Sequence, residues 1–374
     1  MAEFIMVACD LHDKTMVLKV AQGRGDAEKL TVRNTATGRR QLIEQLQGRA
    51  SAVGGARLIF AYEASGQGFG LYDELTAAGI ACHVLAPTKI ARSTQQRQRK
   101  TDENDADQIL QLLRGHVLAG NPLPNVWIPD PQTRDDRELV RARLDAAEKW
   151  STIKVQIQSL LKRHRLQRPP ELKGAWSKKA LNWLRMVSRD AAVGEGTREA
   201  LASLLRQWEF AQAELERLEE SLARLARAPH YAAAVEKLVQ MQGVGVLTAL
   251  VFLTEMGDLA RFANRRQLGA YLGLVPRCYE SGAAGDRKGH ITRQGQSRVR
   301  RVLCQAVWAR VREDGVDCVA YQRQVARNPK HKKIAVVAAM RRLGVRMWHA
   351  ARAAQVEAAN SPQDRRTIAP APAG

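Results

Sequence analysis

Apolar residues recur at alternating steps of three and four along residues 201–225, and this pattern constrains the fold more than any other feature of the sequence. The run comprises Leu201, Leu204, Trp208, Ala211, Leu215, Leu218, Leu222 and Leu225. Such spacing places all these side chains on one face of an α-helix, as in a heptad repeat. A shorter run of the same kind extends from Ala146 to His164. We therefore expect two long helices in the middle of the chain, each with one apolar face.

The spacing does not say what covers these two apolar faces. A segment that contains proline and glycine, residues 168–176, separates the two runs. The helices can therefore pack on each other as an antiparallel pair within one chain. A coiled-coil contact between two copies of the chain would bury the same faces, and an ordinary helical spacer is a third interpretation.

The first third of the chain predicts a different architecture, in which short apolar runs alternate with helical patterns. Five strands are expected at residues 4–9, 15–21, 28–34, 57–62 and 82–86. Helices are expected from about Thr37, which would be the N-cap, and at residues 67–79 and 102–114. This order predicts a mixed sheet covered by helices, which is an α/β domain.

A proline-rich connection at residues 120–132 ends the alternation of strands and helices. Clusters of proline and glycine mark loops and domain boundaries. The last twenty residues are rich in alanine and proline, a composition typical of disorder. We expect an α/β domain at 1–125, a helical coiled-coil linker or dimerisation region at 126–230, a mainly α C-terminal domain at 231–354 and a disordered tail at 355–374.

The charge of the chain indicates a polyanionic partner. The 374 residues include 59 Lys and Arg against 38 Asp and Glu, a formal net charge of +21. A folded chain this basic most simply binds nucleic acid. Residues 287–352 alone carry 17 Lys and Arg against three acidic residues, a net charge of +14. Basic side chains there would contact phosphates, although a solvated charged face is the alternative.

Several protein classes are excluded by simple patterns. No stretch of about 18 apolar residues occurs, so no transmembrane helix is expected. The N-terminus lacks the basic region and cleavage site of a signal peptide. The five cysteines form no CxxC pair, which argues against a structural zinc site or a disulfide framework. We expect a reduced, cytoplasmic setting and no membrane partner.

Acidic residues occur at three places where metal chemistry could use them. Asp10 follows the first predicted strand and Glu63 follows a later buried strand, where a carboxylate needs a partner. Asp102 and Asp105 are three residues apart, so they share a face of the predicted helix. Four such carboxylates could hold Mg²⁺ or Mn²⁺, as hard oxygen ligands do. An acidic first turn that complements the helix dipole is the plainer interpretation of the cluster at 102–107.

Three segments around these acids carry a resemblance to known proteins. Asp10, Glu63 and the Asp102–Asp105 pair, in this strand order, resemble the RNase H-like nucleases and, among them, the RuvC-like resolvases. The segments 8–12, 62–66 and 99–106 resemble the DEDD motifs of the insertion-sequence 110 family of transposases. The C-terminal part is similar to the second domain of that family, in its Gly-x-Gly at 243–245, residues 271–276, Ser281-Gly282 and residues 290–301.

The resemblance implies a fold, a set of site residues and a reaction. It implies an RNase H-like, RuvC-like catalytic domain whose metal ligands are Asp10, Glu63, Asp102 and Asp105. It implies that Ser281 is a nucleophile that forms a covalent phosphoserine with the cut DNA strand; Tyr279 is an alternative nucleophile, and a turn residue before glycine is the plainer reading of Ser281.

The resemblance also implies partners. These are donor and target DNA and an element-encoded structured RNA (a bridge RNA) that pairs with both. The coiled-coil spacing indicates a homodimer, and recombination of two DNAs favours a tetramer on DNA, in the bacterial nucleoid. Gly243 and Gly245 would form a helix-hairpin-helix element that holds a phosphate, or else a tight packing turn. The expected nucleic-acid contacts are Arg97, Arg99, Lys100, Gly243, Gly245, Lys288, Arg293, Arg298, Arg300, Arg301, Lys330, Lys332 and Lys333.

Two other functions fit parts of the same pattern. A Holliday-junction resolvase would use the four carboxylates and a water molecule, without a covalent serine. A nucleic-acid scaffold without catalytic activity would use only the basic surface. The resemblance favours the transposase, because the C-terminal block has no counterpart in resolvases.

Overall fold

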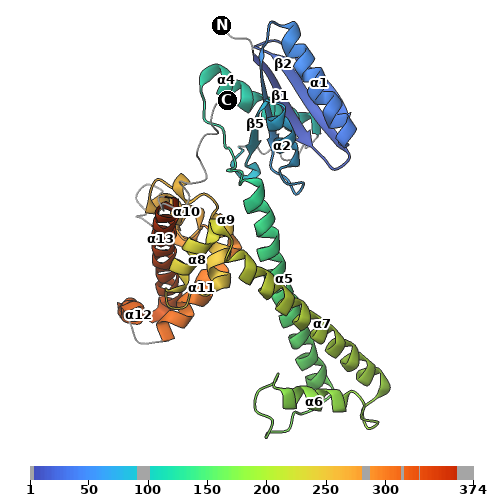
Figure 1. The fold of residues 1–374 in the computed structure, drawn as a ribbon, viewed down its shortest axis with the longest axis vertical. Helices are drawn as coiled ribbons and strands as arrows, with labels where there is room; N and C mark the ends of the chain where they lie inside the picture. Colours follow the sequence, from blue (N-terminus) through green and yellow to red (C-terminus); the bar gives the residue numbers. More distant parts are fainter. Residues whose placement is uncertain (1–3, 91–101, 280–286, 313–315, 328, 360–374) are drawn as a thin grey trace, which may run out of the picture. The chain divides into compact units, whose positions relative to one another are not determined.

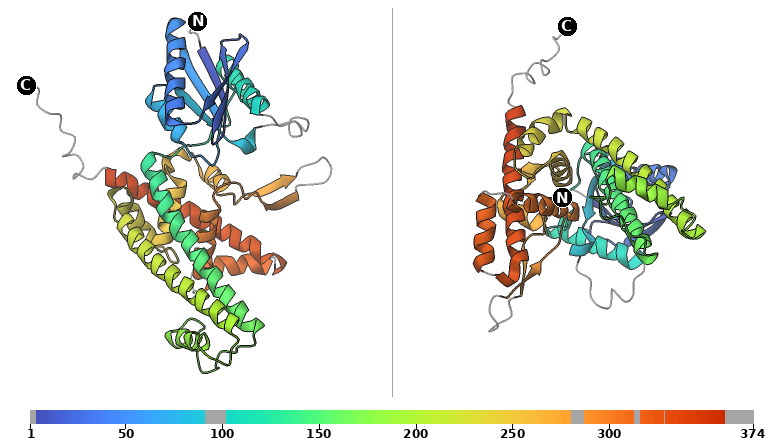
Figure 2. Two further views of the ribbon diagram at one scale, coloured as in Figure 1. Left: turned by 90° about the vertical axis from the view of Figure 1, so that its right-hand side faces the viewer. Right: turned by 90° about the horizontal axis from the view of Figure 1, so that it is seen from below.

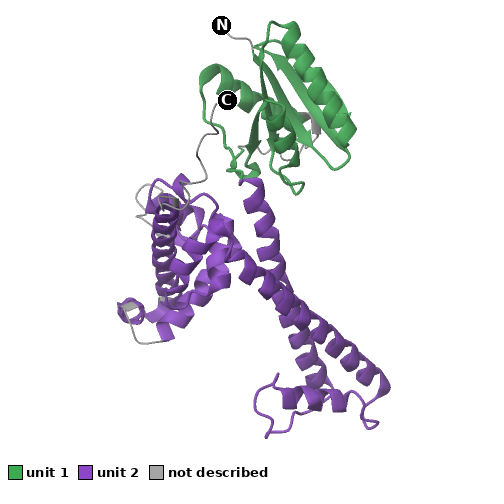
Figure 3. Ribbon diagram, viewed as in Figure 1, with its two compact units in different colours: residues 1–128 green, residues 129–374 purple. Residues whose placement is uncertain are grey.

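The computed structural model describes residues 4–90, 102–279, 287–312, 316–327 and 329–359. Within these ranges, only the backbone is described at residues 102, 103, 278, 279, 287, 288, 316, 331 and 359. The chain divides into two compact units, residues 1–128 and 129–374 (Figure 3).

Unit 1 is built on a five-stranded mixed sheet with the strand order β3-β2-β1-β4-β5. The strands are β1 (Phe4–Leu11), β2 (Thr15–Gln22), β3 (Ala27–Arg33), β4 (Arg57–Glu63) and β5 (Ala81–Leu85). β1, β2 and β3 are antiparallel, whereas β4 and β5 continue the sheet parallel to β1. Parallel neighbours need crossover connections, and these contain α1 (Ala36–Ala52) and α2 (Gly70–Ala77). The predicted mixed α/β sheet is confirmed.

Helices cover both faces of this sheet (Figure 1). Every second residue of β1, beginning with Ile5, packs in a core with α1 and α2. The residues between them, Met6 and Ala8, pack instead against Ile109 and Leu110 of α4 (Asp102–Ala119). Successive side chains of a strand point to opposite faces, so the two cores alternate along the strand.

The start of α1 differs from the prediction by two residues. Its N-cap is Thr35, whose side-chain oxygen accepts a hydrogen bond from the backbone N–H of Gly38 at 3.1 Å. Thr37, the expected cap, lies inside the first turn. Both threonines precede the same apolar face, so sequence spacing alone did not distinguish them.

Unit 2 is helical apart from one β-hairpin. Its longest helices, α5 (Pro131–Arg163) and α7 (Glu195–Leu225), lie side by side, and α6 (Lys178–Val187) lies in the connection between them (Figures 1 and 2). Arg143 pairs with Glu219, and Trp150 stacks on Trp208. Residue numbers therefore rise along α5 while they fall along α7, which makes the pair antiparallel.

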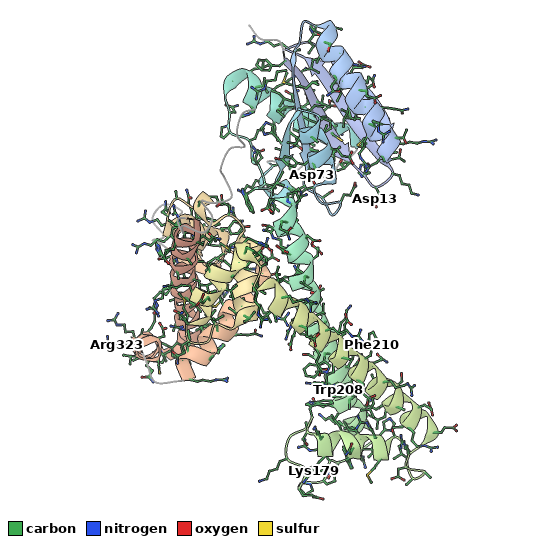
Figure 4. All side chains as sticks on the ribbon, in the orientation of Figure 1. Asp13, Asp73, Lys179, Trp208, Phe210 and Arg323 are labelled. Atoms are coloured by element: carbon green, nitrogen blue, oxygen red, sulfur yellow. The ribbon has the colours of Figure 1, made fainter. Side chains whose placement is uncertain are left out.

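The apolar face of α7 is filled by residues of its own chain. Leu201, Leu205 and Trp208 pack in one core with Ile157 and Leu160 of α5. The indole of Trp208 lies between those of Trp150 and Trp176, with ring centroids 6.0 and 6.1 Å away. Figure 4 labels Trp208 and Phe210; the first is 5% exposed and the second 69%. The antiparallel interpretation of the spacing is thus the one present, and a contact between two copies stays a prediction.

The rest of unit 2 surrounds a second core, which also includes the starts of α5 and the end of α7. Its elements are α8 (Pro229–Val239), α9 (Val246–Met256), α10 (Arg265–Tyr271), β6 (Pro276–Tyr279), β7 (Arg287–Ile291), α11 (Ser297–Arg312), α12 (Val316–Arg327) and α13 (Lys332–Ala359). The predicted tail at 355–374 lies outside the described residues from residue 360 onward, and residues 355–359 belong to α13.

A buried charge ties α5 to α9. The side chain of Glu255 is 1% exposed and accepts hydrogen bonds from Arg141 Nε and Nη2 at 2.9 and 3.1 Å. Arg137 donates to the backbone carbonyls of Thr254 and Glu255 at 2.6 and 3.1 Å. A buried carboxylate is tolerated when it is paired and hydrogen-bonded. This cluster was not predicted, because the sequence does not show which helix faces Glu255.

Across the residues that the structure describes, no helix is both long and apolar enough to cross a membrane.

Candidate active site

Asp10 and Glu63 lie next to each other at one edge of the sheet of unit 1. β1 and β4 are parallel, and their register pairs Cys9 with Tyr62. Asp10 and Glu63 are the next residues of the two strands, and neighbouring strands are about 4.8 Å apart. Both side chains are partly buried. The prediction that two strand ends bring these carboxylates to a common place is therefore supported by the register.

The two carboxylates also point to the same face of the sheet. Asp10 alternates with Cys9, whose side chain lies in the core with α1 and α2. Glu63 alternates in the same way with Tyr62. By the two-residue period of a strand, Asp10 and Glu63 face the other side, which α4 covers through Met6 and Ala8.

The acidic start of α4 is directed toward this edge. Asp107 forms an ion pair of 3.3 Å with Lys19 of β2, which lies opposite Ala8. Asp107 thus lies near Ala8, while Arg114, later in the helix, donates to the carbonyl of Gly25 near the Phe4 end of β1. The residues before Asp107, including Asp105, are therefore nearer along the helix axis to the end of β1 that carries Asp10. Asp102 is the first residue of the helix, and its side chain lies outside the described residues.

His12 contacts Asp10, an interaction that the sequence did not predict. Its Nε2 lies 3.0 Å from Asp10 Oδ2, and its side chain is 42% exposed whereas that of Asp10 is 17% exposed. His12 is the first residue after β1, so the contact joins the β1–β2 turn to the strand. On the opposite face, burial and the nearby charge of Asp10 raise the pKa of the Cys9 thiol, which keeps that cysteine neutral.

The donor types fit a divalent cation. Asp10, Glu63 and Asp105 offer carboxylate oxygens, the hard ligands that Mg²⁺ and Mn²⁺ take. Among the side chains that the structure describes, no three Asp, Glu, His or Cys residues already form a group that could hold a metal ion. The side chain of Asp102, the fourth predicted ligand, lies outside the described residues, so the metal site stays a prediction.

The predicted nucleophile, Ser281, lies outside the described residues. In the sequence it comes two positions after the end of β6 and six before the start of β7, and these two strands form a hairpin. The base of this hairpin is described. Gly273 and Gly295 both have positive φ, and an added Cβ would lie 2.2 Å from the carbonyl of Gln294 and 1.8 Å from that of Tyr271, respectively. Only glycine fits this close approach of two backbone segments.

Three of the arginines predicted to contact nucleic acid make contacts within the chain. Arg300 Nη1 donates to the carbonyls of Leu272 and Gly295 at 3.1 and 3.0 Å, so it fastens the base of the hairpin. Burial, together with the charge of Arg293, lowers the pKa of Arg300. Arg298 and Arg301 of α11 pair with acidic residues of α5, namely Asp145 at 3.6 Å and Glu148 at 3.3 Å.

The remaining predicted contacts differ in how much of them the structure describes. Lys330, Lys332, Lys333 and Arg293 are exposed. The side chain of Lys288, and Arg97, Arg99 and Lys100 entirely, lie outside the described residues.

The two glycines of the 243–245 turn serve different purposes. Gly243 has φ +74°, and a Cβ on it would lie 2.6 Å from the carbonyl of Ala306 in α11. This glycine therefore allows close packing, the plainer of the two predicted roles. Gly245 is the N-cap of α9, and nothing lies within 4 Å of the place that its Cβ would take. Its phosphate contact stays a prediction.

Comparison with protein families gives two matches. A model described as "Transposase" matches residues 7–165. A model described as "Transposase IS116/IS110/IS902 family" matches residues 235–322. The first range contains the four predicted carboxylates, and the second contains Ser281 and the glycine turn at 243–245.

Individual relatives agree with these matches. The chain is 33% identical over 276 residues to "Putative transposase y4qE" of Sinorhizobium fredii, which covers 72% of this chain and 62% of the relative. The aligned part is thus less than two thirds of that relative. The chain is 28% identical over 318 residues to "Putative transposase y4rJ" of the same organism, covering 78% and 76%. It is 24% identical over 248 residues to the "Transposase for insertion sequence element IS1533" of Leptospira borgpetersenii, covering 66% and 69%.

Proposed function

The chain belongs to the IS116/IS110/IS902 family of transposases, and on this premise we propose that it cuts and rejoins DNA strands as the transposase of an insertion sequence. The observation that carries the proposal is the placement of Asp10 and Glu63 side by side on the sheet face that α4 covers. A mixed sheet with carboxylates at this edge supports a RuvC-like catalytic domain in particular.

We infer that Asp10, Glu63, Asp102 and Asp105 hold Mg²⁺ or Mn²⁺. A divalent cation there polarises a phosphoryl oxygen and lowers the pKa of an attacking hydroxyl or water. The protein's own contribution is to keep these carboxylates at fixed strand and helix positions. His12 restrains the carboxylate of Asp10 through the contact between Nε2 and Oδ2, as outer-sphere partners of metal ligands do.

Ser281 is the nucleophile of the proposed reaction. Its Oγ loses the hydroxyl proton and forms a bond to the scissile phosphorus, the bond from phosphorus to the leaving sugar oxygen breaks, and that oxygen takes up a proton, so that no net proton is gained or lost. The phosphoserine diester retains the energy of the broken linkage, so a second strand can displace the serine without a high-energy cofactor. The closely interlocked backbone at Gly273 and Gly295, fastened by Arg300, would give the hairpin of Ser281 a rigid base.

The partners follow from the same proposal. Donor and target DNA bind the exposed basic side chains, and a structured bridge RNA pairs with both and supplies the sequence specificity. A net charge of +21 supports binding of several nucleic-acid strands. A homodimer, and a tetramer on DNA, would bring two recombining DNA molecules together.

A recombination assay with the RNA and both DNA partners tests the proposal. Ser281→Ala and Asp102→Ala should each abolish recombination, because one removes the nucleophile and the other removes a metal ligand. If strand cleavage survives in Ser281→Ala but not in Asp102→Ala, the resolvase interpretation replaces the transposase. Full activity of both variants would rule out the site.

A further inference from the structure

An open cleft of about 850 Å³ lies beside the candidate active site, within unit 1. Two loops form it: the β1–β2 turn, residues 11–15, and the start of the β4–α2 connection, residues 65–67. These loops follow β1, in which Asp10 is the residue before the last, and β4, which ends in Glu63. His12 lines the cleft and also contacts the carboxylate of Asp10. The cleft therefore lies directly beside the carboxylate of Asp10.

The lining of this cleft is polar and carries one lysine, Lys14, and one carboxylate, the exposed Asp13. Its other polar side chains are His12, Thr15, Ser65 and Gln67. Lys14 is exposed, and no ion-pair partner for its ammonium group occurs among the residues that the structure describes. An exposed ammonium flanked by hydroxyl and amide groups is suited to a phosphodiester, which accepts hydrogen bonds and carries one negative charge.

A hydrogen-bonded brace holds both walls of the cleft. Asn34 Nδ2 donates to the carbonyl of His12 at 2.8 Å and to Gln67 Oε1 at 3.0 Å, so one side chain joins the two loops. The backbone N–H of Asn34 donates to the carbonyl of Lys14 at 2.9 Å. Gln67 Nε2 in turn donates to the carbonyl of Leu11 at 3.4 Å.

The brace is anchored in the helices that cover the sheet. Arg39 Nη1 donates to Asn34 Oδ1 at 2.9 Å. The same guanidinium makes two bonds to Glu74 of α2, at 2.7 and 2.8 Å. Bidentate Arg–carboxylate pairs are among the stronger and more directional polar contacts. Loops fixed in this way present a preformed surface rather than one that must be ordered on binding.

We propose that this cleft binds the phosphodiester backbone of a DNA strand directly beside the phosphate that is cut, with Lys14 as the phosphate contact. The inference rests on the proposed function, because it takes the neighbouring carboxylates as the place of cutting. It adds a subsite for the flanking part of the strand. Asn34 and Gln67 are positioning residues, because their hydrogen bonds link the two loops.

The test uses the full chain, with Lys14→Ala compared with Arg24→Ala. Arg24 is exposed in the β2–β3 turn, at the other end of strand β2, so each variant removes one positive charge from a turn of the same sheet. The probe is a single-stranded DNA 30-mer with 5-iodouracil at defined positions, bound in Ca²⁺. Irradiation followed by mass spectrometry maps the cross-linked peptides, and fluorescence anisotropy gives Kd at several salt concentrations.

Cross-links are expected in the peptides that contain residues 11–15 and 65–67. Lys14→Ala should reduce the slope of log Kd against log salt by about 0.7 and weaken binding roughly threefold, whereas Arg24→Ala should change neither. In strand cleavage, Lys14→Ala should raise KM with kcat retained. Ser65→Glu, which adds a negative charge to the cleft, should weaken binding further.

The proposal is overturned if Lys14→Ala and Arg24→Ala have the same salt slope and no cross-link maps to these loops. Cross-linking of an RNA 30-mer of the same sequence, without cross-linking of the DNA, also overturns it. Asp10→Asn separates this outcome from failure of the proposed function. That variant should keep the cross-links while it loses cleavage; if it retains cleavage, the carboxylate site itself is wrong.

Discussion

The acidic residues of unit 1 and the basic residues of unit 2 were both predicted from the sequence to be functional. In the structure the predicted acidic strand residues lie side by side, whereas several of the predicted basic residues make contacts within the chain. The register of β1 and β4 places Asp10 and Glu63 at one sheet edge, on the face that α4 covers. Of the arginines that follow Ser281, Arg298 and Arg301 pair with acids of α5, and Arg300 bonds two backbone carbonyls. Position in a strand thus predicts where a side chain lies better than charge does.

The reason for the difference is physical. Side chains of a strand alternate between the two faces of the sheet. The apolar run therefore shows both where the strand ends and to which face its last side chain points. A surface arginine has a long side chain and five donors, and its partner depends on the tertiary neighbourhood. Four predictions test how far this contrast holds.

The largest effect is expected from Asp10→Asn. Loss of one carboxylate from the site should reduce strand cleavage by about three orders of magnitude, near the upper end for loss of one electrostatic group. DNA affinity should be almost unchanged, because the exposed cations remain. Cleavage kinetics and anisotropy on one preparation measure both quantities.

Asp26→Asn is the matched control for Asp10→Asn. Asp26 is exposed in the β2–β3 turn, at the opposite end of the sheet. The Asp26→Asn variant should cleave DNA at the wild-type rate. Equal cleavage by Asp26→Asn and Asp10→Asn would show that the carboxylate of Asp10 is not part of the active site.

The next largest effect concerns the buried charge in unit 2. Arg141→Met leaves the carboxylate of Glu255, 1% exposed, without its bidentate partner. We expect a loss of about 3 kcal/mol in the free energy of unfolding, and the double variant Arg141→Met/Glu255→Met should recover most of it. Urea denaturation followed by circular dichroism gives both values.

Arg143→Met, on the same helix, provides the comparison. Its partner Glu219 is 56% exposed, so the loss should stay below about 1 kcal/mol. A loss as large as that of Arg141→Met would show that replacing any arginine of α5 lowers the free energy of unfolding by this amount, whether or not its partner carboxylate is buried.

A smaller effect separates structural cations from those that contact nucleic acid. Replacement of Lys330, Lys332 and Lys333 by alanine removes three exposed charges, so the slope of log Kd against log salt for duplex DNA should fall by about 2.7. Thermal stability of this triple variant should not change.

Arg300→Ala should leave the salt slope unchanged and should lower the free energy of unfolding by about 1–3 kcal/mol, because two backbone carbonyls lose their hydrogen-bond donor. If Arg300→Ala instead lowers the salt slope and leaves stability intact, the arginine is a phosphate contact after all.

The smallest effect is a pH dependence of stability in unit 1. Burial, followed by the charge of nearby His116, lowers the pKa of His83. The unfolded chain therefore binds this proton more readily than the folded chain. The stability contributed by neutral His83 is complete above about pH 7 and is lost as the pH falls through the ordinary histidine range near 6.5. Because His83 is only half buried, the decrease in Tm should be about 1–2 °C.

His83→Gln should remove this part of the pH dependence in thermal scans between pH 5 and pH 8. His164→Gln, an exposed histidine of unit 2, should leave the curve unchanged. If His83→Gln has the same dependence of Tm on pH as the wild type, the lowered pKa of His83 does not contribute to the pH dependence of stability.

The strands and the helical middle could be predicted because their patterns are local. All five strands lie within two residues of their expected ranges at either end. The spacing from Leu201 to Leu225 predicted the long helix α7, but the buried residue that follows Leu201 is Leu205 rather than Leu204. The spacing could not identify the partner helix, because α5 and a second copy of the chain would cover the same face.

The parts that the sequence did not predict depend on contacts between distant residues. Asn34 joins His12 and Gln67, which are 22 and 33 residues away along the chain. Lys19 pairs with Asp107, an acid that the sequence left without a role. No local pattern marks these residues, and only the folded sheet brings them together.

The central claim, that DNA is cut through a covalent serine, is tested most directly by trapping the intermediate. Labelled substrate DNA is incubated with the full chain, its RNA and Mg²⁺, denatured in detergent, and separated by electrophoresis. We expect a protein–DNA adduct for the wild type, and no adduct for Ser281→Ala or for Asp10→Asn. An adduct that persists in Ser281→Ala, or cleavage by the wild type without any adduct, would contradict the central claim.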